Sequence, residues 1–245
     1  MPAEPNSNST AHAEQTLQDL VYAVSHDLGA SVRAIKGFSE LLTRRYADSL
    51  DDDGRNFLRL MGKGAADLQG QLDGLLAYSR VTTRGKPLIP TSLTEVWQSV
   101  FDRSSEKRRL AAVTVESTEL PVVRGDSQQL AQLFFELLDN AIKFRRDEPL
   151  KIQITAHQNP TRPLPASGST LRYCQVEFRD NGRGIAQQHL NRVFQIFQRC
   201  CADVPGVGAG LAIAQRIVDR HGGEIWAESE LEVGSLFAVT LPLAD

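Results

Sequence analysis

Two long runs of heptad-spaced residues constrain the fold of this chain more than any other feature of its sequence. The first run extends from about Thr16 to Tyr46, and the second from about Gly54 to Thr83. In both runs the steps between seam positions alternate between 3 and 4 residues, a spacing typical of helices that pack side by side. The seam positions are Val24, Leu28, Ser31, Ile35, Phe38 and Leu42 in the first run, and Leu58, Met61, Ala65, Leu68, Leu72, Leu75 and Ser79 in the second.

A short polar segment, Ala47–Asp53, joins the two runs and predicts a turn whose carboxylates cap the second helix. Two helices joined by such a turn form an antiparallel hairpin. One hairpin leaves the far side of its seam without a packing partner, whereas two hairpins together make a four-helix bundle. The seam therefore predicts a homodimer.

The pattern changes at Thr83–Pro90, where one Gly and two Pro interrupt the helical periodicity. We expect a disordered tail over 1–15, the helical hairpin over 16–84 and a second domain over 85–245. Beyond the linker, strand and helix patterns alternate, which predicts a sheet with helices on one face. The expected helices are Ser92–Arg109, Asp126–Arg145, Gln187–Gln198 and Ala209–His221, and the expected strands are Ala111–Glu116, Val122–Arg124, Lys151–His157, Arg172–Arg179, Glu224–Glu228 and Ser235–Leu241. Gln158–Thr170 is expected to be an exposed loop.

The composition excludes several classes of protein. The 27 Lys and Arg nearly balance the 30 Asp and Glu, which argues against a nucleic-acid-binding protein. No stretch approaches the roughly 18 uncharged apolar residues that span a bilayer, and the first residues do not have the pattern of a secretory signal. The 3 Cys include no CxxC pair, which argues against a disulfide framework or a zinc site. We expect a cytoplasmic protein.

His26 lies about 200° round the first helix from the seam residue Val24, so it is expected to face solvent. An exposed helical His is usually an ordinary surface residue. Here Asp27 follows it directly. An exposed imidazole can act as a nucleophile, and a neighbouring carboxylate can hold its other ring nitrogen and accept a proton.

Three further patterns have residue types that bind nucleotides. Glu136, Asn140 and Lys143 share one helix face, which is either a solvated stripe or a face for magnesium and phosphate. The run DNGRGI, from Asp180 to Ile185, follows a strand and permits a sharp turn close to a ligand. The run GVGAGL, from Gly206 to Leu211, leads into a helix whose N-terminus would hold phosphate.

The order of these motifs resembles that of the sensor histidine kinases of two-component signalling. Six motifs follow one another within a region from about Leu17 to Leu243: SHDL, ELLDNAIKF, DNGRGI, VFQIFQR, GVGAGLAIAQRIVDRHGG and IWAESELEVGSLFAVTLP. The Phe box VFQIFQR and the end of the second domain are most similar to the phytochrome-type branch of the family. The resemblance implies a dimerisation and histidine-phosphotransfer hairpin, which forms a dimeric four-helix bundle. A Bergerat-fold ATP-binding domain follows it, an α/β sandwich of the histidine kinase, gyrase and heat-shock ATPase type.

The resemblance also implies roles for individual residues. His26 matches the phosphoacceptor, and Asp27 the acidic residue that orients it. Glu136 and Asn140 match the positions that hold Mg²⁺ through ATP, with Glu136 counted among the catalytic residues, and Asp180 matches the carboxylate that reads adenine. The other ATP-binding positions, including the Phe box and the glycines of the ATP lid, are Lys143, Phe144, Gly182, Gly184, Ile185, Phe194, Phe197, Arg199, Gly206, Gly208, Gly210 and Leu211.

The implied activity is autophosphorylation of His26 from Mg-ATP and transfer of the phosphoryl group to an Asp of a response regulator. About 16 residues precede the hairpin, which is too few for a sensor domain. The chain is therefore either an excised kinase core or a kinase that receives its signal from a separate sensor protein.

Two positions depart from the family pattern and leave alternatives open. Ser31 stands where the family usually has Pro, and Ala30 stands where phosphatase-active members often have Thr or Asn. One alternative is a degenerate kinase-like dimer that regulates another kinase or a receiver domain. A second is a Bergerat-fold ATPase or a serine kinase that opposes a sigma factor, which would not need His26 on a hairpin.

Overall fold

The computed structural model describes residues 7–158, 160, 171–201 and 203–244 of the chain. It divides the chain into two compact units, with the boundary between Thr83 and Arg84. Most of the loop predicted over Gln158–Thr170 lies outside the described residues.

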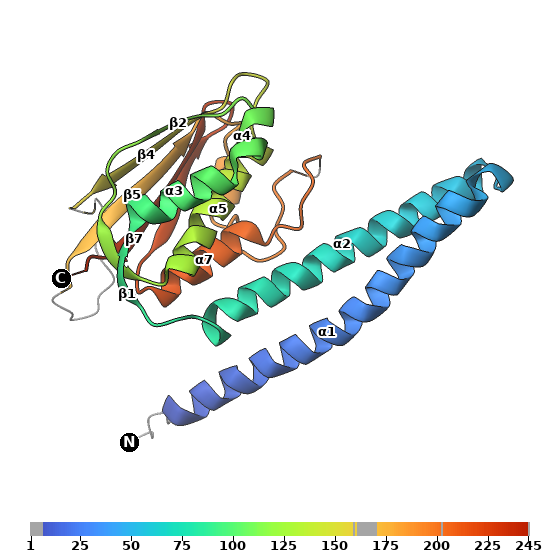
Figure 1. Ribbon diagram of the computed structural model, residues 1–245, viewed down its shortest axis with the longest axis horizontal. Helices are drawn as coiled ribbons and strands as arrows, with labels where there is room; N and C mark the ends of the chain where they lie inside the picture. Colours follow the sequence, from blue (N-terminus) through green and yellow to red (C-terminus); the bar gives the residue numbers. More distant parts are fainter. Residues whose placement is uncertain (1–6, 159, 161–170, 202, 245) are drawn as a thin grey trace. The chain divides into compact units, whose positions relative to one another are not determined.

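The first unit is an antiparallel helical hairpin (Figure 1). Helix α1 covers Ser7–Tyr46, a 3-10 turn covers Ala47–Ser49, and α2 covers Asp52–Thr83. The amide of Gly54 donates to Asp51 Oδ1 at 2.8 Å, so the predicted acidic turn does cap the second helix. Helix α1 begins earlier than predicted, because residues 7–15 include no Pro or Gly that would disfavour a helix. The tail predicted over 1–15 is wrong for 7–15, and 1–6 lie outside the described residues.

The contact between α1 and α2 uses small and mid-sized side chains. Ser25, Val32 and Ser39 of α1 are buried, as are Ala65 and Leu72 of α2. The larger seam residues lie outside this contact: Leu28 and Ile35 are each 49% exposed, and Phe38 is 66% exposed. One hairpin therefore leaves an apolar stripe on its surface, in agreement with the prediction that the far side of the seam lacks a partner within a single chain. We call Leu28, Ile35, Phe38, Leu42, Met61 and Leu68 the outer stripe.

The second unit contains two sheets. Strands β1 (Ile89–Ser92) and β3 (Val122–Gly125) form a small antiparallel pair. The main sheet has five strands in the order β2-β4-β5-β7-β6. Among the described strands of this sheet, only β2 and β4 pair in parallel, and the other neighbours are antiparallel. The strands of the main sheet are β2 Thr114–Ser117, β4 Lys151–His157, β5 Tyr173–Asp180, β6 Ile225–Glu230 and β7 Gly234–Pro242.

Three helices cover one face of the main sheet (Figure 1). Helix α5 lies between α3 and α7, and the apolar sides of all three are buried. Trp97 of α3 joins the helices to the sheet, because its ring meets Phe134 of α5 and Phe178 of β5 edge-on. The helices of this unit are α3 Leu93–Arg103, α4 Ser105–Leu110, α5 Ser127–Lys143, α6 Gln187–Leu190 and α7 Gly210–Arg220.

The single helix predicted over Ser92–Arg109 is two helices, α3 and α4, and two further elements are clearly shorter than predicted. The helix predicted over Gln187–Gln198 ends at Leu190. Phe197 adopts φ 64°, and its amide donates to the carbonyl of Gly208 at 2.8 Å rather than to a preceding turn of helix. The strand predicted from Ala111 begins at Thr114, because Ala111 caps α4 and Ala112 has φ 48°.

A buried histidine joins the end of α7 to the start of α5. His221 is 2% exposed. Its Nδ1 lies 2.7 Å from the carbonyl oxygen of Ile217, and its Nε2 accepts the amide of Asp126 at 3.0 Å. These contacts require the neutral ring with hydrogen on Nδ1. Burial, assisted by the charge of Arg220, lowers the pKa of His221 below its ordinary value, although the hydrogen bond with the Ile217 carbonyl and the charge of Asp126 oppose the shift.

We expect this histidine to make the unit less stable in mild acid. Because the folded pKa lies below the unfolded one, the unfolded chain binds more protons, and stability falls as pH drops below about 6.5. Above that pH, neutral His221 makes its full contribution to the stability of the unit. Thermal melting from pH 8 to pH 5 measures the effect, and His221→Gln should have a flatter profile than the wild type between pH 6.5 and 5. Equal slopes for the two proteins would contradict this role.

Within the described residues, no helix combines the length and apolar character that crossing a membrane requires.

Candidate nucleotide-binding site

The turn after β5 presents a buried carboxylate beside α5. Asp180, the last residue of β5, is 8% exposed, and its Oδ1 accepts the amide of Gly182 at 2.8 Å. Burial raises the pKa of Asp180, and hydrogen bonds from the amides of Gly182 and Ser235 partly offset that rise. The turn therefore fixes the orientation of this carboxylate.

The glycines of this turn allow it to fit between two neighbouring segments. A Cβ on Gly182 would lie 2.8 Å from both Asp180 Oδ1 and the carbonyl oxygen of Phe144, the residue that ends α5. Gly184 has φ 70°, and a Cβ there would overlap the carbonyl oxygen of Glu230. The amide of the next residue, Ile185, donates to Ser229 Oγ at 2.8 Å. The turn is thus held between α5 and β6.

We expect Gly184→Ala to destabilise the second unit and abolish nucleotide binding. The substitution adds the left-handed strain of an L-residue, about 1–2 kcal/mol, to a clash with backbone that has no flexible side chain to yield. Gly222→Ala is the matched control, because Gly222 has φ 74° but no atom within 4 Å of its Cβ position. Chemical denaturation of both variants isolates the clash. Equal losses of stability in the two variants would contradict the tight fit at Gly184.

Helix α5 carries the predicted polar stripe at its C-terminal half. Glu136 is half-buried, and its pKa is raised by that burial and by the charge of Asp139. A hydrogen bond with Gln132 and the charges of two lysines oppose the rise. A Cβ on Gly210, the first residue of α7, would lie 2.7 Å from Glu136 Oε2. The stripe therefore reaches the segment that leads into α7.

Lys143 belongs to an ion-pair cluster that the sequence analysis did not identify. Asp139 Oδ2 lies 2.6 Å from Lys143 Nζ, and Asp139 Oδ1 lies 3.0 Å from Lys107 Nζ on α4. Burial alone would raise the pKa of Asp139, but the hydrogen bonds from the two lysines outweigh it and lower the pKa below its usual value. Asp139 belongs to the ELLDN motif, and its position next to Asn140 is the one sequence feature that could have identified it as a site residue. Nothing in the sequence placed Lys107 near it.

The segment between the Phe box and α7 folds back toward the stripe. Arg199 Nη2 donates to the carbonyl of Val204 at 2.9 Å, and Asp203 pairs with Arg183 of the DNGRGI turn at 2.9 Å. A Cβ on Gly206 would lie 3.9 Å from Lys143 Nζ. The other glycine of the segment, Gly208, accepts the amide of Phe197 through its carbonyl. Phe194 is half-buried and packs its ring edge-on against Phe237 of β7, a core residue.

The structure therefore brings together three of the predicted patterns. The end of the α5 stripe contacts the strand-end turn, where Gly182 lies against the carbonyl of Phe144. The stripe also contacts the start of α7, where Gly210 lies against Glu136, and Lys143 lies near Gly206. Asn140 lies on the same α5 stripe. His26 and Asp27 belong to the other unit, and the side chain of His26 lies outside what the structure describes. Leu211 follows Gly210 in the first turn of α7.

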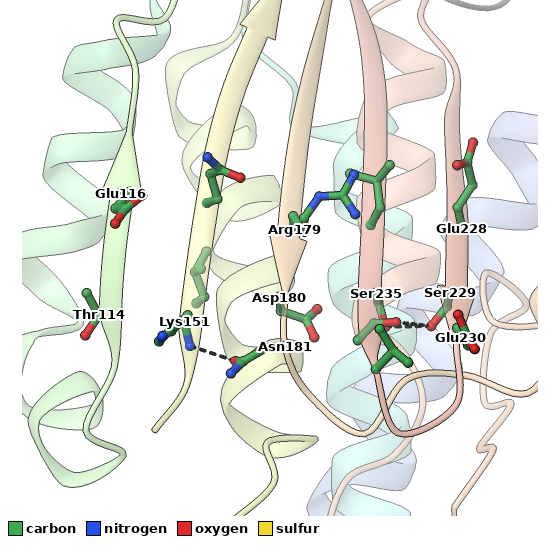
Figure 2. Close-up of a pocket in the computed structure, with 15 residues that line it drawn as sticks. Thr114, Glu116, Lys151, Arg179, Asp180, Asn181, Glu228, Ser229, Glu230 and Ser235 are labelled. Carbon is green, nitrogen blue, oxygen red and sulfur yellow. Dashed lines mark hydrogen bonds between the residues drawn. The ribbon is translucent and has the colours of Figure 1, made fainter. Parts of the chain in front are cut away.

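A separate cavity of about 580 Å³ lies on the open face of the main sheet (Figure 2). Charged side chains from several strands line it, among them Glu116, Lys151, Arg179 and Glu228. Asp180 belongs to its lining, but Glu136, Asn140 and Lys143 do not. This cavity is therefore distinct from the site that the three patterns form on the helical side of the sheet.

Both units match families of known proteins. Residues 16–84 match the family model "His Kinase A (phospho-acceptor) domain", and residues 125–245 match "Histidine kinase-, DNA gyrase B-, and HSP90-like ATPase". This chain belongs to the two-component sensor histidine kinases. Cyanobacterial phytochrome A of Nostoc sp. is 36% identical over 232 residues, which are 93% of this chain and 28% of the phytochrome. The chain spans less than a third of the length of the curated phytochromes it matches.

Solved histidine kinases share the fold. Full-length ShkA in complex with AMPPNP superposes with a TM-score of 0.62 at 22% identity, covering 92% of this chain and 46% of ShkA. ThkA in complex with the response regulator protein TrrA superposes with a TM-score of 0.62 at 20% identity, covering 97% of this chain and 66% of that chain. The predicted fold class, a helical hairpin followed by an α/β domain of the histidine kinase type, is confirmed.

Proposed function

We propose that this histidine kinase chain transfers the γ-phosphoryl group of Mg-ATP to His26 and then to an Asp of a response regulator. The observation that carries the proposal is the convergence of the Asp180 turn, the α5 stripe and the glycine segment at one place on the second unit. Such a site supplies an acceptor for a base, oxygen ligands for a cation and a lysine for phosphate. The hairpin supplies His26 on the long helix α1.

The residues on α5 fit a magnesium ion that arrives with ATP. Mg²⁺ in nucleotide sites is usually held by one or two protein oxygens together with substrate phosphates. Glu136 and Asn140 offer a carboxylate and an amide one helical turn apart. Gly210 faces the Glu136 carboxylate, and because it has no side chain it leaves the space beside that carboxylate open. When bound, Mg²⁺ neutralises the charge that develops on the β- and γ-phosphates.

The transfer itself requires positioning and charge more than covalent chemistry from the protein. A ring nitrogen of His26 attacks the γ-phosphorus, the bond between that phosphorus and the β–γ bridging oxygen breaks, and ADP leaves. Asp27 orients the ring and takes up the proton of its other nitrogen. Asp180 holds the adenine, and Lys143 faces the phosphates once they displace it from Asp139. The phosphoramidate then passes its phosphoryl group to the carboxylate of a response regulator.

Incubation of the intact chain with γ-labelled Mg-ATP tests the proposal. A phosphohistidine gives label that is lost in acid and stable in base. Label that is stable in acid and lost in base would indicate a phosphoserine, and would favour the serine-kinase alternative. Absence of label, with ATP still bound, would favour the regulatory dimer that Ala30 and Ser31 suggested. Complexes such as that of ThkA with TrrA support a response regulator as the partner.

We also propose that the hairpin forms a homodimer through the outer stripe. Its members are large apolar side chains that one chain leaves 42–66% exposed. Fully burying one such side chain contributes about 1.5–3 kcal/mol, and a twofold interface buries it in both copies. An exposed apolar stripe along both helices is a typical interaction surface.

Phe38→Asp should shift the chain from dimer to monomer. The substitution removes a buried Phe38 from both copies of the interface and places a carboxylate there instead. The dimer dissociation constant should therefore rise by at least roughly tenfold. Sedimentation of the intact chain measures it. Leu110→Asp is the control, because Leu110 is 72% exposed at the end of α4, outside the hairpin. A Phe38→Asp variant that stays as dimeric as the control would contradict the bundle.

A further inference from the structure

Two charged side chains of the second unit hold the backbone of Lys86, three residues beyond the end of α2. The amide of Lys86 donates to Asp126 Oδ2 at 2.7 Å. Its carbonyl accepts a hydrogen bond from Arg220 Nη2 at 2.5 Å. Asp126 is the N-cap of α5 and Arg220 is the last residue of α7, so one linker residue is tied to both helices.

Arg220 makes further contacts that fix its guanidinium. Its Nη1 donates to Gln129 Oε1 at 2.7 Å and lies 3.7 Å from Asp126 Oδ2. The side chains of Arg220 and Asp126 are only 20% and 2% exposed. A guanidinium presents several donors in a rigid fork, which lets one side chain span α5 and the linker. We call Lys86, Asp126, Gln129 and Arg220 the linker clasp.

Gly85 allows the clasp to close. A Cβ on Gly85 would overlap the guanidinium of Arg220. Because that guanidinium ends a flexible side chain, it would move aside and lose its bond to the carbonyl of Lys86. The linker thus contributes to the clasp from its own side, through a residue without a side chain.

We propose that Arg220 is a positioning residue that shortens the free linker between the hairpin and the nucleotide-binding unit. With the clasp closed, 84 and 85 are the residues between the end of α2 at Thr83 and the held Lys86. With the clasp open, the segment that links α2 to the second unit extends over 84–88, because β1 begins at Ile89. The inference rests on the proposed function, in which His26 of one unit must meet ATP held by the other.

The change in linker length sets the size of the effect. The effective concentration of two tethered groups falls with roughly the −3/2 power of linker length, so growth from two linking residues to five should lower it about fourfold. ATP affinity should not change, because no residue of the clasp belongs to the nucleotide site. A role in positioning therefore lowers the rate of autophosphorylation and leaves the half-saturating concentration of Mg-ATP unchanged.

Arg220→Gln and Gly85→Ala weaken the clasp from opposite sides in the intact chain, because each removes the bond from Arg220 to the carbonyl of Lys86. Each variant should incorporate label more slowly at saturating Mg-ATP, by up to about fourfold, and the double variant should be no slower than either single one. Trypsin should cleave the Arg84–Gly85 bond faster in both, because a protease needs the residues that flank the bond in a free, extended form. Arg124→Gln, an exposed arginine on β3 close to Asp126, is the control and should match the wild type.

Several outcomes would overturn the proposal. Unchanged cleavage at Arg84 in both variants would show that the clasp does not restrain the linker. Slower incorporation accompanied by a raised half-saturating Mg-ATP concentration would show that Arg220 acts on the nucleotide site, and multiplicative losses in the double variant would show that the two residues act separately. A wild type without phosphohistidine would overturn the proposed function and with it the positioning role, whereas faster cleavage of the variants would still establish the clasp.

Discussion

His26→Gln should abolish the incorporation of acid-labile label from γ-labelled Mg-ATP. Glutamine has no ring nitrogen that could attack phosphorus, so the phosphoramidate cannot form. ATP binding should persist, because Asp180, Asn140 and Lys143 belong to the other compact unit. Equilibrium binding of ATP and label incorporation, measured on the same preparation, separate the two steps.

His12→Gln is the matched control for this variant, since His12 lies on the same helix α1. It should incorporate label as the wild type does. Base-stable label that persists on His26→Gln would place the phosphoacceptor elsewhere. A loss of ATP binding in His26→Gln would show that nucleotide binding by the second unit depends on the hairpin, although the chain divides into two compact units between Thr83 and Arg84.

The elements with the clearest periodicity could be predicted from the sequence. Lys151–His157 alternates polar and apolar residues, and the structure has β4 with those bounds. The glutamate, asparagine and lysine stripe on α5 also follows from spacing alone, because positions three and four apart share a helix face. Local patterns therefore predicted most of the strands and helices, and the residues that share one face of an element.

Features that depend on contacts between distant segments could not be predicted in this way. Phe197 ends the expected helix because its amide bonds to Gly208, a partner that no local pattern reveals. Arg220 meets Lys86 across 134 positions of sequence. In the hairpin, heptad spacing identified helices that pack, but it did not distinguish the contact within one chain, which Ser25 and Ser39 share, from the outer stripe.

Asp180→Asn should weaken ATP binding roughly 10- to 100-fold. In the wild type the carboxylate accepts the amide of Gly182 and, in the proposed function, the exocyclic amine of adenine as well. An ionised carboxylate has acceptor sites for both donors, whereas the Asn amide has one acceptor oxygen and presents an NH₂ group in place of the other. One buried donor then lacks a partner, which costs about 1–3 kcal/mol. Titration with ATP measures the change.

The nature of the base separates a contact with adenine from a general disturbance of the turn. Inosine triphosphate carries an oxygen where ATP carries the amine, so the wild type should prefer ATP, and Asp180→Asn should lose most of that preference because its NH₂ can donate to the oxygen. Asp219→Asn makes the same chemical change on the exposed side of α7 and should keep the preference for ATP. If Asp180→Asn binds both nucleotides more weakly by the same factor, Asp180 supports the turn through Gly182 but does not contact the amine.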